Sequence, residues 1–138
     1  MHWVLRPWRQ VLDFSGRATR REYWLFQLQL IVLYFLLMFG TAALGAQLGS
    51  EAGGIVMVAA LVLFVLFYFV ASLSSGVRRV HDHDKSGWLI LLSFIPLVGW
   101  IFLLIMTLTP GTPGENSYGY DPRQGDQPSP DEVAAIFS

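Results

Sequence analysis

The residues best suited to chemistry lie together in one short charged segment, Arg78–Lys85. Within it, His81, Asp82, His83 and Asp84 place two imidazoles next to two carboxylates. An imidazole beside a carboxylate can transfer protons near neutral pH, so His81 and Asp82 are candidates for an acid–base pair. This pattern leaves open a membrane enzyme that uses the two side chains as acid and base.

The same segment is a weak candidate for a metal site, with His81, His83 and Asp84 as the side chains that would bind a divalent ion. The sequence offers no second cluster of ligands, and the three basic residues of the segment would repel a cation. The chain has no cysteine, which excludes thiolate metal sites, disulfides and cysteine nucleophiles. We therefore expect no metal and no other cofactor.

Long uncharged stretches surround this segment, because Asp, Glu, Lys and Arg are absent from residues 23–50, 52–77 and 86–114. A helix needs about 20 mostly apolar residues to cross the hydrocarbon core, and a soluble helix of that length would carry a polar stripe. Charged residues make up 14% of the chain, against about 25% in soluble domains. The sequence predicts an all-α membrane protein with three transmembrane helices, near 24–44, 55–73 and 88–108.

The pattern divides the chain into three regions. Residues 1–22 are amphipathic and predict a short N-terminal interfacial helix. Residues 23–109 form the three-helix transmembrane domain, in which Pro96 predicts a kink in a last span that is too short to turn back and cross twice. Residues 110–138 form a polar, flexible C-terminal tail.

Local signals mark the ends of the first span. Thr19 and Glu22 fit a capping box, so this helix should begin near Arg20. Gly45 and Gly49 are spaced as G-x-x-x-G, a close-packing motif of membrane helices. The polar residues beside them favour a turn in the first loop, and helix packing remains the alternative.

Basic residues set the expected orientation. Eight of them precede the first span or lie in the second loop, against one in the C-terminal tail. The positive-inside rule then places the N-terminus and the second loop in the cytoplasm and the tail outside.

The basic residues also suggest contacts between segments. Glu22 could pair with an arginine of the second loop, and Asp82 with an arginine of the N-terminal segment, which would tie the first two spans together. The same surplus would attract anionic lipid headgroups, at about 1 kcal/mol for each basic residue. The alternative is that these arginines only set the topology.

Three ordered motifs resemble those of domain-of-unknown-function family 805, small bacterial inner-membrane proteins of the YhaH type. They are residues 13–24 (DFSGRATRREYW), residues 78–82 with 86–88 (RRVHD and SGW), and a closing motif made of residues 96–99 (PLVG) and the run from Pro110 to Pro122. The resemblance covers about residues 13–122 and implies a bacterial cytoplasmic-membrane location, but no activity, because the family has no established one. The motif and candidate interaction residues are Gly16, Arg17, Arg20, Glu22, Trp24, Arg78, Arg79, His81, Asp82, Ser86, Gly87 and Trp88.

The spans contain no ionisable residue near their centres, and transporters usually need one. We therefore expect a non-enzymatic scaffold that binds lipid or a membrane-protein partner, including a second copy of itself, through a basic cytoplasmic face. A small oligomeric transporter or channel is the first alternative, and the His81–Asp82 enzyme is the second. The net charge of −1 argues against a nucleic-acid partner.

Overall fold

The computed structural model describes residues 4–123, and all of their side chains except that of Ser50. The described part of the chain is helical and contains no β-strand, which confirms the predicted all-α class. Most of the predicted flexible tail, from residue 124 onwards, lies outside the described residues. The elements are α1 (Arg6–Arg9), α2 (Arg20–Leu48), α3 (Ser50–His81), η2 (Gly87–Phe94) and α4 (Val98–Leu108).

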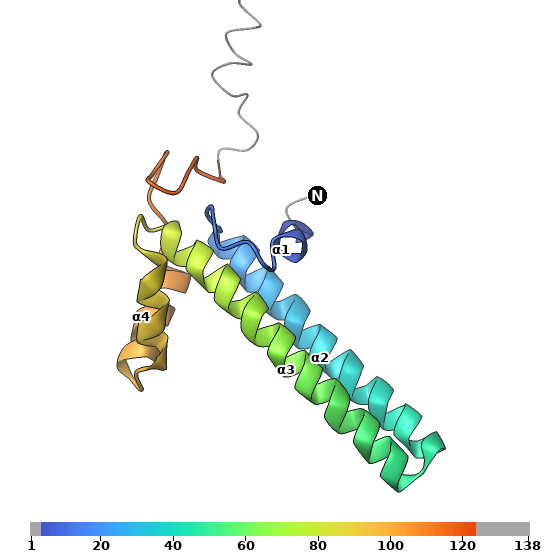
Figure 1. Ribbon diagram of the computed structural model, residues 1–138. Helices are drawn as coiled ribbons and strands as arrows, with labels where there is room; N and C mark the ends of the chain where they lie inside the picture. Colours follow the sequence, from blue (N-terminus) through green and yellow to red (C-terminus); the bar gives the residue numbers. More distant parts are fainter. Residues whose placement is uncertain (1–3, 124–138) are drawn as a thin grey trace, which may run out of the picture.

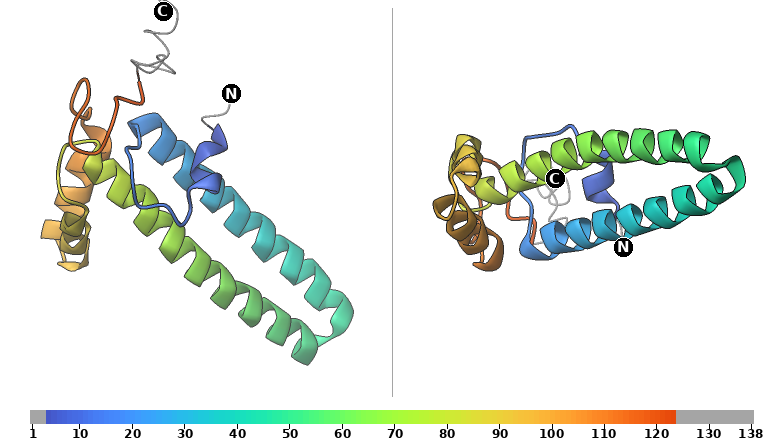
Figure 2. Two further views of the ribbon diagram at one scale, coloured as in Figure 1. Left: turned by 45° about the horizontal axis from the view of Figure 1, so that its top comes forward. Right: turned by 90° about the horizontal axis from the view of Figure 1, so that it is seen from below.

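Helices α2 and α3 form a long antiparallel hairpin that turns at Gly49 (Figures 1 and 2). Both are long and apolar enough to cross a membrane, and they contain the first two predicted spans. As the sequence predicted, α2 begins at Arg20, behind Thr19, whose hydroxyl oxygen accepts a hydrogen bond of 3.2 Å from the Glu22 backbone N–H. The two helices thus have the form expected of membrane spans.

Glycines allow α2 and α3 to approach closely near the turn. A Cβ added at Gly53 would lie only 2.6 Å from the Cα of Gly45 on the facing helix. Gly49 itself has a φ of +86°, which glycine adopts without the steric cost that other residues incur. Both interpretations of the G-x-x-x-G pattern therefore apply, but the packing partner of Gly45 is Gly53 and not Gly49.

The N-terminal segment packs across the hairpin near the ends of α2 and α3 that lie far from Gly49 (Figure 2). α1 is a single turn, and Trp8 within it packs on Phe26 and Phe67, with ring centroids 5.4 and 6.1 Å away. The Trp8 indole N–H also donates a 2.7 Å hydrogen bond to Gln29. These contacts hold the segment against both long helices.

The third predicted span, residues 88–108, is wrong as a single helix. The chain forms η2 and α4, which pack against each other, with a reversal of direction at residues 95–97 (Figure 1). Leu97 has a φ of +65°, and the Val98 N–H donates to the Pro96 carbonyl at 2.8 Å, so the turn is very tight. Gly99 permits the reversal, because a Cβ there would overlap the Leu92 carbonyl oxygen of η2.

This reversal brings the chain back to its starting end. The His83 imidazole Nε2, just before η2, lies 2.9 Å from the Met106 carbonyl oxygen at the end of α4. The Thr112 N–H donates to the Asp82 carbonyl at 2.8 Å. The expectation that the tail begins at the opposite end from the second loop is therefore wrong. The physical reason is that η2 and α4 run in opposite directions, so the chain leaves α4 close to the point where it enters η2.

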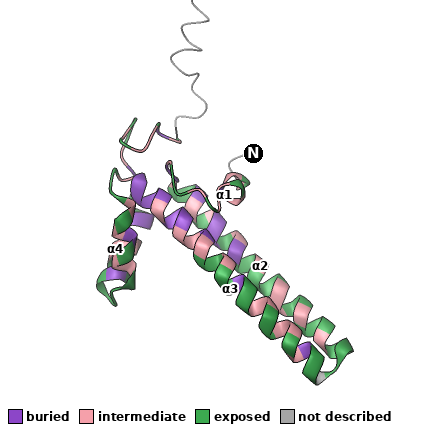
Figure 3. Ribbon diagram, viewed as in Figure 1, coloured by how far each residue is buried: buried purple, intermediate pink, exposed green. Residues whose placement is uncertain are grey.

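Burial is concentrated at this shared end of the molecule (Figure 3). Toward Gly49, most side chains of α2 and α3 are exposed and apolar, among them Phe39 and Leu63. At the other end, the buried side chains are mainly polar or charged. A soluble protein shows the reverse arrangement, so the fold fits a chain whose exposed helices contact lipid.

We expect the Gly53→Ala substitution to lower the melting temperature of the detergent-solubilised protein. The new methyl group would collide with the backbone of α2 at Gly45, and overpacking of this kind typically costs about 1–3 kcal/mol. The matched control is Gly54→Ala, because the neighbouring glycine has open space around it. Equal melting temperatures for the two variants would contradict the close contact.

Candidate functional site

A buried ionic cluster lies where α2 begins and α3 ends. Arg17 approaches Asp82 with its Nε and Nη2 atoms 3.0 and 2.9 Å from the carboxylate Oδ1. Arg79, one turn back on α3, binds the other oxygen, Oδ2. All three side chains are only 1% exposed. One carboxylate therefore holds two guanidinium groups from segments that are far apart in the sequence.

Arg17 also binds the segment that follows α4. Its Nη1 donates to the Gly114 and Gly119 carbonyls at 2.6 and 3.2 Å, and its Nη2 donates to the Thr112 carbonyl at 2.6 Å. A guanidinium group has five N–H donors in a planar fork, so one arginine can join several strands of chain. Arg17 thereby connects the N-terminal segment, the end of α3 and the closing segment.

Arg79 makes equivalent contacts on the other side of Asp82. It donates to the Ala18 carbonyl at 3.1 Å and to the Thr109 carbonyl. The Ala18 N–H in turn donates to the Arg78 carbonyl at 3.0 Å. Two arginines and one aspartate leave one positive charge in excess, and the backbone carbonyl dipoles offset part of it.

A second ion pair extends the cluster towards α1. The Nη1 of Arg78 lies 3.8 Å from Glu22 and donates to the Gln10 side chain at 2.5 Å. The two pairs that the sequence suggested, one from Glu22 and one from Asp82, are therefore both present in the structure. They join the first two spans as expected, and they bury the arginines in doing so.

His81 lies in an enclosed position beside the cluster. Its ring stacks on Tyr118 with centroids 3.8 Å apart, and its Nδ1 lies 3.2 Å from the Gly16 carbonyl oxygen. A Cβ added at Gly87 would lie 2.9 Å from the Nε2 of the ring. Gly87 thus leaves room for the imidazole, whereas Gly16 has a φ of +76°, which glycine adopts readily, and presents its carbonyl oxygen to the ring.

The structure does not assemble the candidate acid–base pair or metal site. The Asp82 carboxylate is bound by arginines, and His83 and Asp84 contact Met106 and Ser117 instead. Burial lowers the pKa of His83, which disfavours its charged form. Over residues 4–123, no three His, Cys, Asp or Glu side chains lie close enough together to hold an ion.

The closing segment has its own anchor, Asp121. Its carboxylate accepts hydrogen bonds from the Gly114 N–H at 3.1 Å and from the Arg123 Nε at 2.8 Å. Burial acts to raise the pKa of Asp121, but the bonds from Arg123 and Gly114 outweigh it and lower that pKa to about 2. Asp121 therefore shapes the loop whose carbonyls at Gly114 and Gly119 receive Arg17.

Sequence reasoning missed several residues of this site. Gly111 lies against Asp82, where a Cβ would overlap the carboxylate, and Tyr118 and Asp121 complete the closing loop. All three fall within the closing motif, which was the available signal. Gly111 and Tyr118 contact Asp82 and His81, which lie about 30 residues or more earlier in the chain. Asp121 binds its neighbours through a loop geometry that composition does not reveal.

The remaining candidate residues lie outside the ionic cluster. Arg20 and Trp24 contact the end of α4 by donating to the Leu108 and Thr107 carbonyls at 2.8 and 3.3 Å. Ser86 is exposed before η2, and Trp88 is 79% exposed. Four of the twelve candidates thus sit beside the short helix pair and not in the cluster.

We expect Asp82→Asn to destabilise the protein severely, since it leaves two buried guanidinium groups without their carboxylate. Breaking a buried pair on one side typically costs about 3–5 kcal/mol. Thermal unfolding in detergent measures the loss. Asp84→Asn is the matched control, because Asp84 is exposed and, within residues 4–123, its carboxylate accepts only from the Ser117 N–H. Similar small shifts for both variants would show that the cluster does not hold the fold together.

Comparisons with known proteins agree with the motifs. The family model described as "Protein of unknown function (DUF805)" matches residues 11–120. The chain is 36% identical to inner membrane protein YhaH of Escherichia coli K12 over 123 residues, which are 89% of this chain and 98% of that protein. It is 37% identical to inner membrane protein YhaI of the same organism over 125 residues, 91% of this chain and 98% of that protein. No solved structure matches. With the resemblance predicted from the motifs confirmed, the chain belongs to the DUF805 family of inner membrane proteins, whose function is unknown.

Proposed function

We propose that this inner membrane protein is a non-enzymatic scaffold, in which the ionic cluster fixes the arrangement of the membrane-embedded helices. The observation that carries this proposal is the structural role of Asp82, one of the two candidate acid–base residues of the central motif. Its carboxylate binds two arginines and is 1% exposed, so it is poorly placed to take a proton from a substrate. His81 is held between Tyr118 and Gly16 in the same way.

The proposed topology has two crossings and one re-entrant hairpin. α2 and α3 span the bilayer, while η2 and α4 enter from the charged end and return to it. At about 1.5 Å per residue, the 11 residues of α4 reach about half way through a hydrocarbon core of about 30 Å. The exposed apolar residues around the turn, such as Leu97 and Trp100, suit contact with lipid tails.

The distribution of charge supports the same topology. Arg123 donates to the Thr112 carbonyl at 2.7 Å and so lies at the end that carries the other eight basic residues. The turn between α2 and α3 carries none. With two crossings, all nine basic residues lie on one side of the membrane. With three crossings, eight would lie on one side and one on the other, so the two-crossing topology follows the positive-inside rule better. The N-terminal segment, the second loop and the closing segment are then all cytoplasmic.

Single cysteines can test this topology directly, since the natural chain has none. We expect Lys85→Cys and Glu115→Cys to resist a membrane-impermeant maleimide added to spheroplasts, and Glu51→Cys to react with it. All three positions are exposed in the structure. After the membrane is permeabilised, all three should react, which controls for accessibility. Reaction of Glu115→Cys but not of Lys85→Cys in intact spheroplasts would restore the three-span topology.

The structure changes which residues can form the basic face of the scaffold. Arg17, Arg78 and Arg79 are buried and paired, so they hold the protein together and are unavailable to lipid. Arg21 and Lys85 are exposed at the same end of the molecule. The proposed face for anionic headgroups is therefore made by these exposed residues and their exposed neighbours.

We expect the protein to enrich anionic lipid from mixed phosphatidylglycerol and phosphatidylcholine, and this enrichment to fall with rising salt. The double variant Arg21→Gln and Lys85→Gln should lose much of it, since each basic residue near the surface contributes about 1 kcal/mol. The charge-preserving double variant Arg21→Lys and Lys85→Arg should retain it. Lipid analysis of nanodiscs gives the readout. Equal lipid composition in all of these samples, or ion or solute flux through proteoliposomes, would contradict the proposed scaffold.

A further inference from the structure

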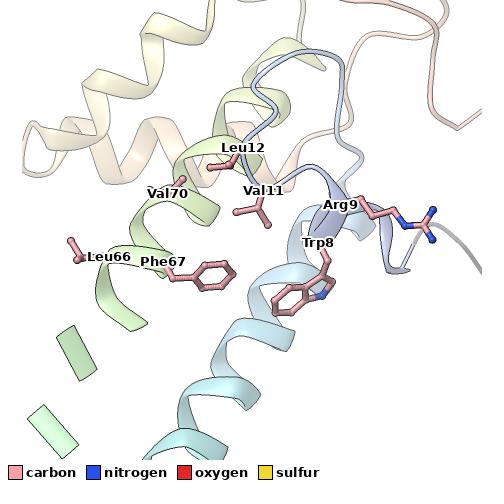
Figure 4. A pocket seen from close by; sticks show the side chains of 7 residues that line it. All are labelled: Trp8, Arg9, Val11, Leu12, Leu66, Phe67 and Val70. Atoms are coloured by element: carbon pink, nitrogen blue, oxygen red, sulfur yellow. The ribbon is translucent and has the colours of Figure 1, made fainter. Parts of the chain in front are cut away.

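An apolar groove of about 710 Å³ runs between the N-terminal segment and α3 (Figure 4). One wall is formed by Leu66, Phe67 and Val70, and the other by four residues of the N-terminal segment, Trp8, Arg9, Val11 and Leu12. The volume falls within the range of about 300–1,000 Å³ that is typical of small-molecule sites. Its lining is aromatic and aliphatic apart from the one charged residue, Arg9.

The walls of the groove are held in place by contacts within the protein. Trp8 is fixed by its hydrogen bond to Gln29 and by its stacking on Phe67. The Ser74 hydroxyl of α3 donates to the Gln10 and Asp13 carbonyls at 3.0 and 3.2 Å, which secures the N-terminal segment at its other end. A site that is already formed loses little ordering entropy when a ligand enters.

The position of the groove determines what can fill it. Leu66 and Val70 belong to a helix that we assign to the bilayer, and Leu66 is 61% exposed. Water in a groove with this lining would lack hydrogen-bond partners, so the occupant must be apolar over most of its length. An acyl chain of the surrounding lipid meets that requirement.

The groove also has a charged margin. Arg9 is exposed, and in Figure 4 its guanidinium group points away from the apolar walls. Arg6 lies one turn earlier on the same short helix. Headgroups lie at the edge of the hydrocarbon region, so a phosphate at this height would meet Arg9 while the attached chain follows Leu66 towards the interior of the bilayer.

We propose that this groove is a binding site for one anionic glycerophospholipid, with an acyl chain between the N-terminal segment and α3 and the phosphate beside Arg9. The site rests on the proposed function in one respect, because the scaffold's topology places this end in the cytoplasmic leaflet. It differs from the general basic face because it takes a single lipid, which is selected by both its chain and its charge.

Native mass spectrometry of the delipidated full chain in detergent tests the site, with phosphatidylglycerol and phosphatidylcholine as the probes. We expect one phosphatidylglycerol to bind before any phosphatidylcholine does. Arg9→Gln should weaken phosphatidylglycerol binding by about fivefold, the equivalent of one surface charge, and leave phosphatidylcholine unchanged. Leu66→Trp, which adds bulk to the groove wall, should weaken both lipids.

Two matched controls separate the groove from its surroundings. Lys85→Gln removes a charge that does not line the groove, and Leu63→Trp adds the same ring one turn away along the exposed face of α3. Leu63→Trp should bind the first lipid as the natural protein does. Lys85→Gln should lower the later binding of phosphatidylglycerol to the basic face but leave the first phosphatidylglycerol, held in the groove, unchanged. If Lys85→Gln weakens phosphatidylglycerol as much as Arg9→Gln does, the groove site is overturned but the basic face stands. If Leu66→Trp instead dissolves a dimer that excludes lipid, the groove belongs to a second copy and the proposal fails.

Discussion

The shared carboxylate of Asp82 is the interaction on which the fold depends. A buried charge is stable only when its partners are close and well oriented, because desolvation of an ion costs several kcal/mol. Here Arg17 and Arg79 each approach a different carboxylate oxygen, and Nη groups of both arginines also donate to backbone carbonyls. Each carbonyl belongs to a segment that must then lie at the cluster. The electrostatic requirement of three side chains thus sets the position of the chain before α2 and after α4.

The reversal between η2 and α4 follows from this requirement. Thr109, Thr112 and Gly114 can accept hydrogen bonds from Arg79 and Arg17 only if the chain, after leaving α3 at His81, returns to the end of that helix by Thr109. A straight helix through the bilayer would carry these carbonyls to the opposite side, some 30 Å away. Leu97, in a left-handed conformation that leucine rarely adopts, indicates that the tight turn is imposed by such contacts and not by local preference.

Particular residues show how far the sequence could predict the structure. The helical spans of α2 and α3 and the cap at Thr19 follow from local patterns, which act over one or two turns. The pairs of Arg17 with Asp82 and of Arg78 with Glu22 could be anticipated in kind, because a charge map shows which opposite charges share an end. The length of the apolar stretch led to the wrong prediction of one helix over residues 88–108, because a count of apolar residues contains no information on where the chain reverses direction. Gly99 is the residue in the sequence that marks the reversal. Its requirement for glycine becomes clear only from the structure, where the Leu92 carbonyl lies against it.

The placement of Arg9 completes the contrast between two kinds of arginine at one end of the molecule. Buried arginines such as Arg17 use their N–H donors to bind carboxylate and carbonyl oxygens of the protein. Their replacement should therefore lower stability before it affects lipid binding. The guanidinium group of an exposed arginine such as Arg9 is available to a ligand. Because the walls beside Arg9 are apolar and suit an acyl chain, a lipid whose chain fills the groove can place its phosphate next to Arg9. The basic residues of the family motif therefore serve mainly to hold the fold together. In the proposed site, the lipid phosphate is recognised by Arg9, which lies outside the motif beside an apolar groove.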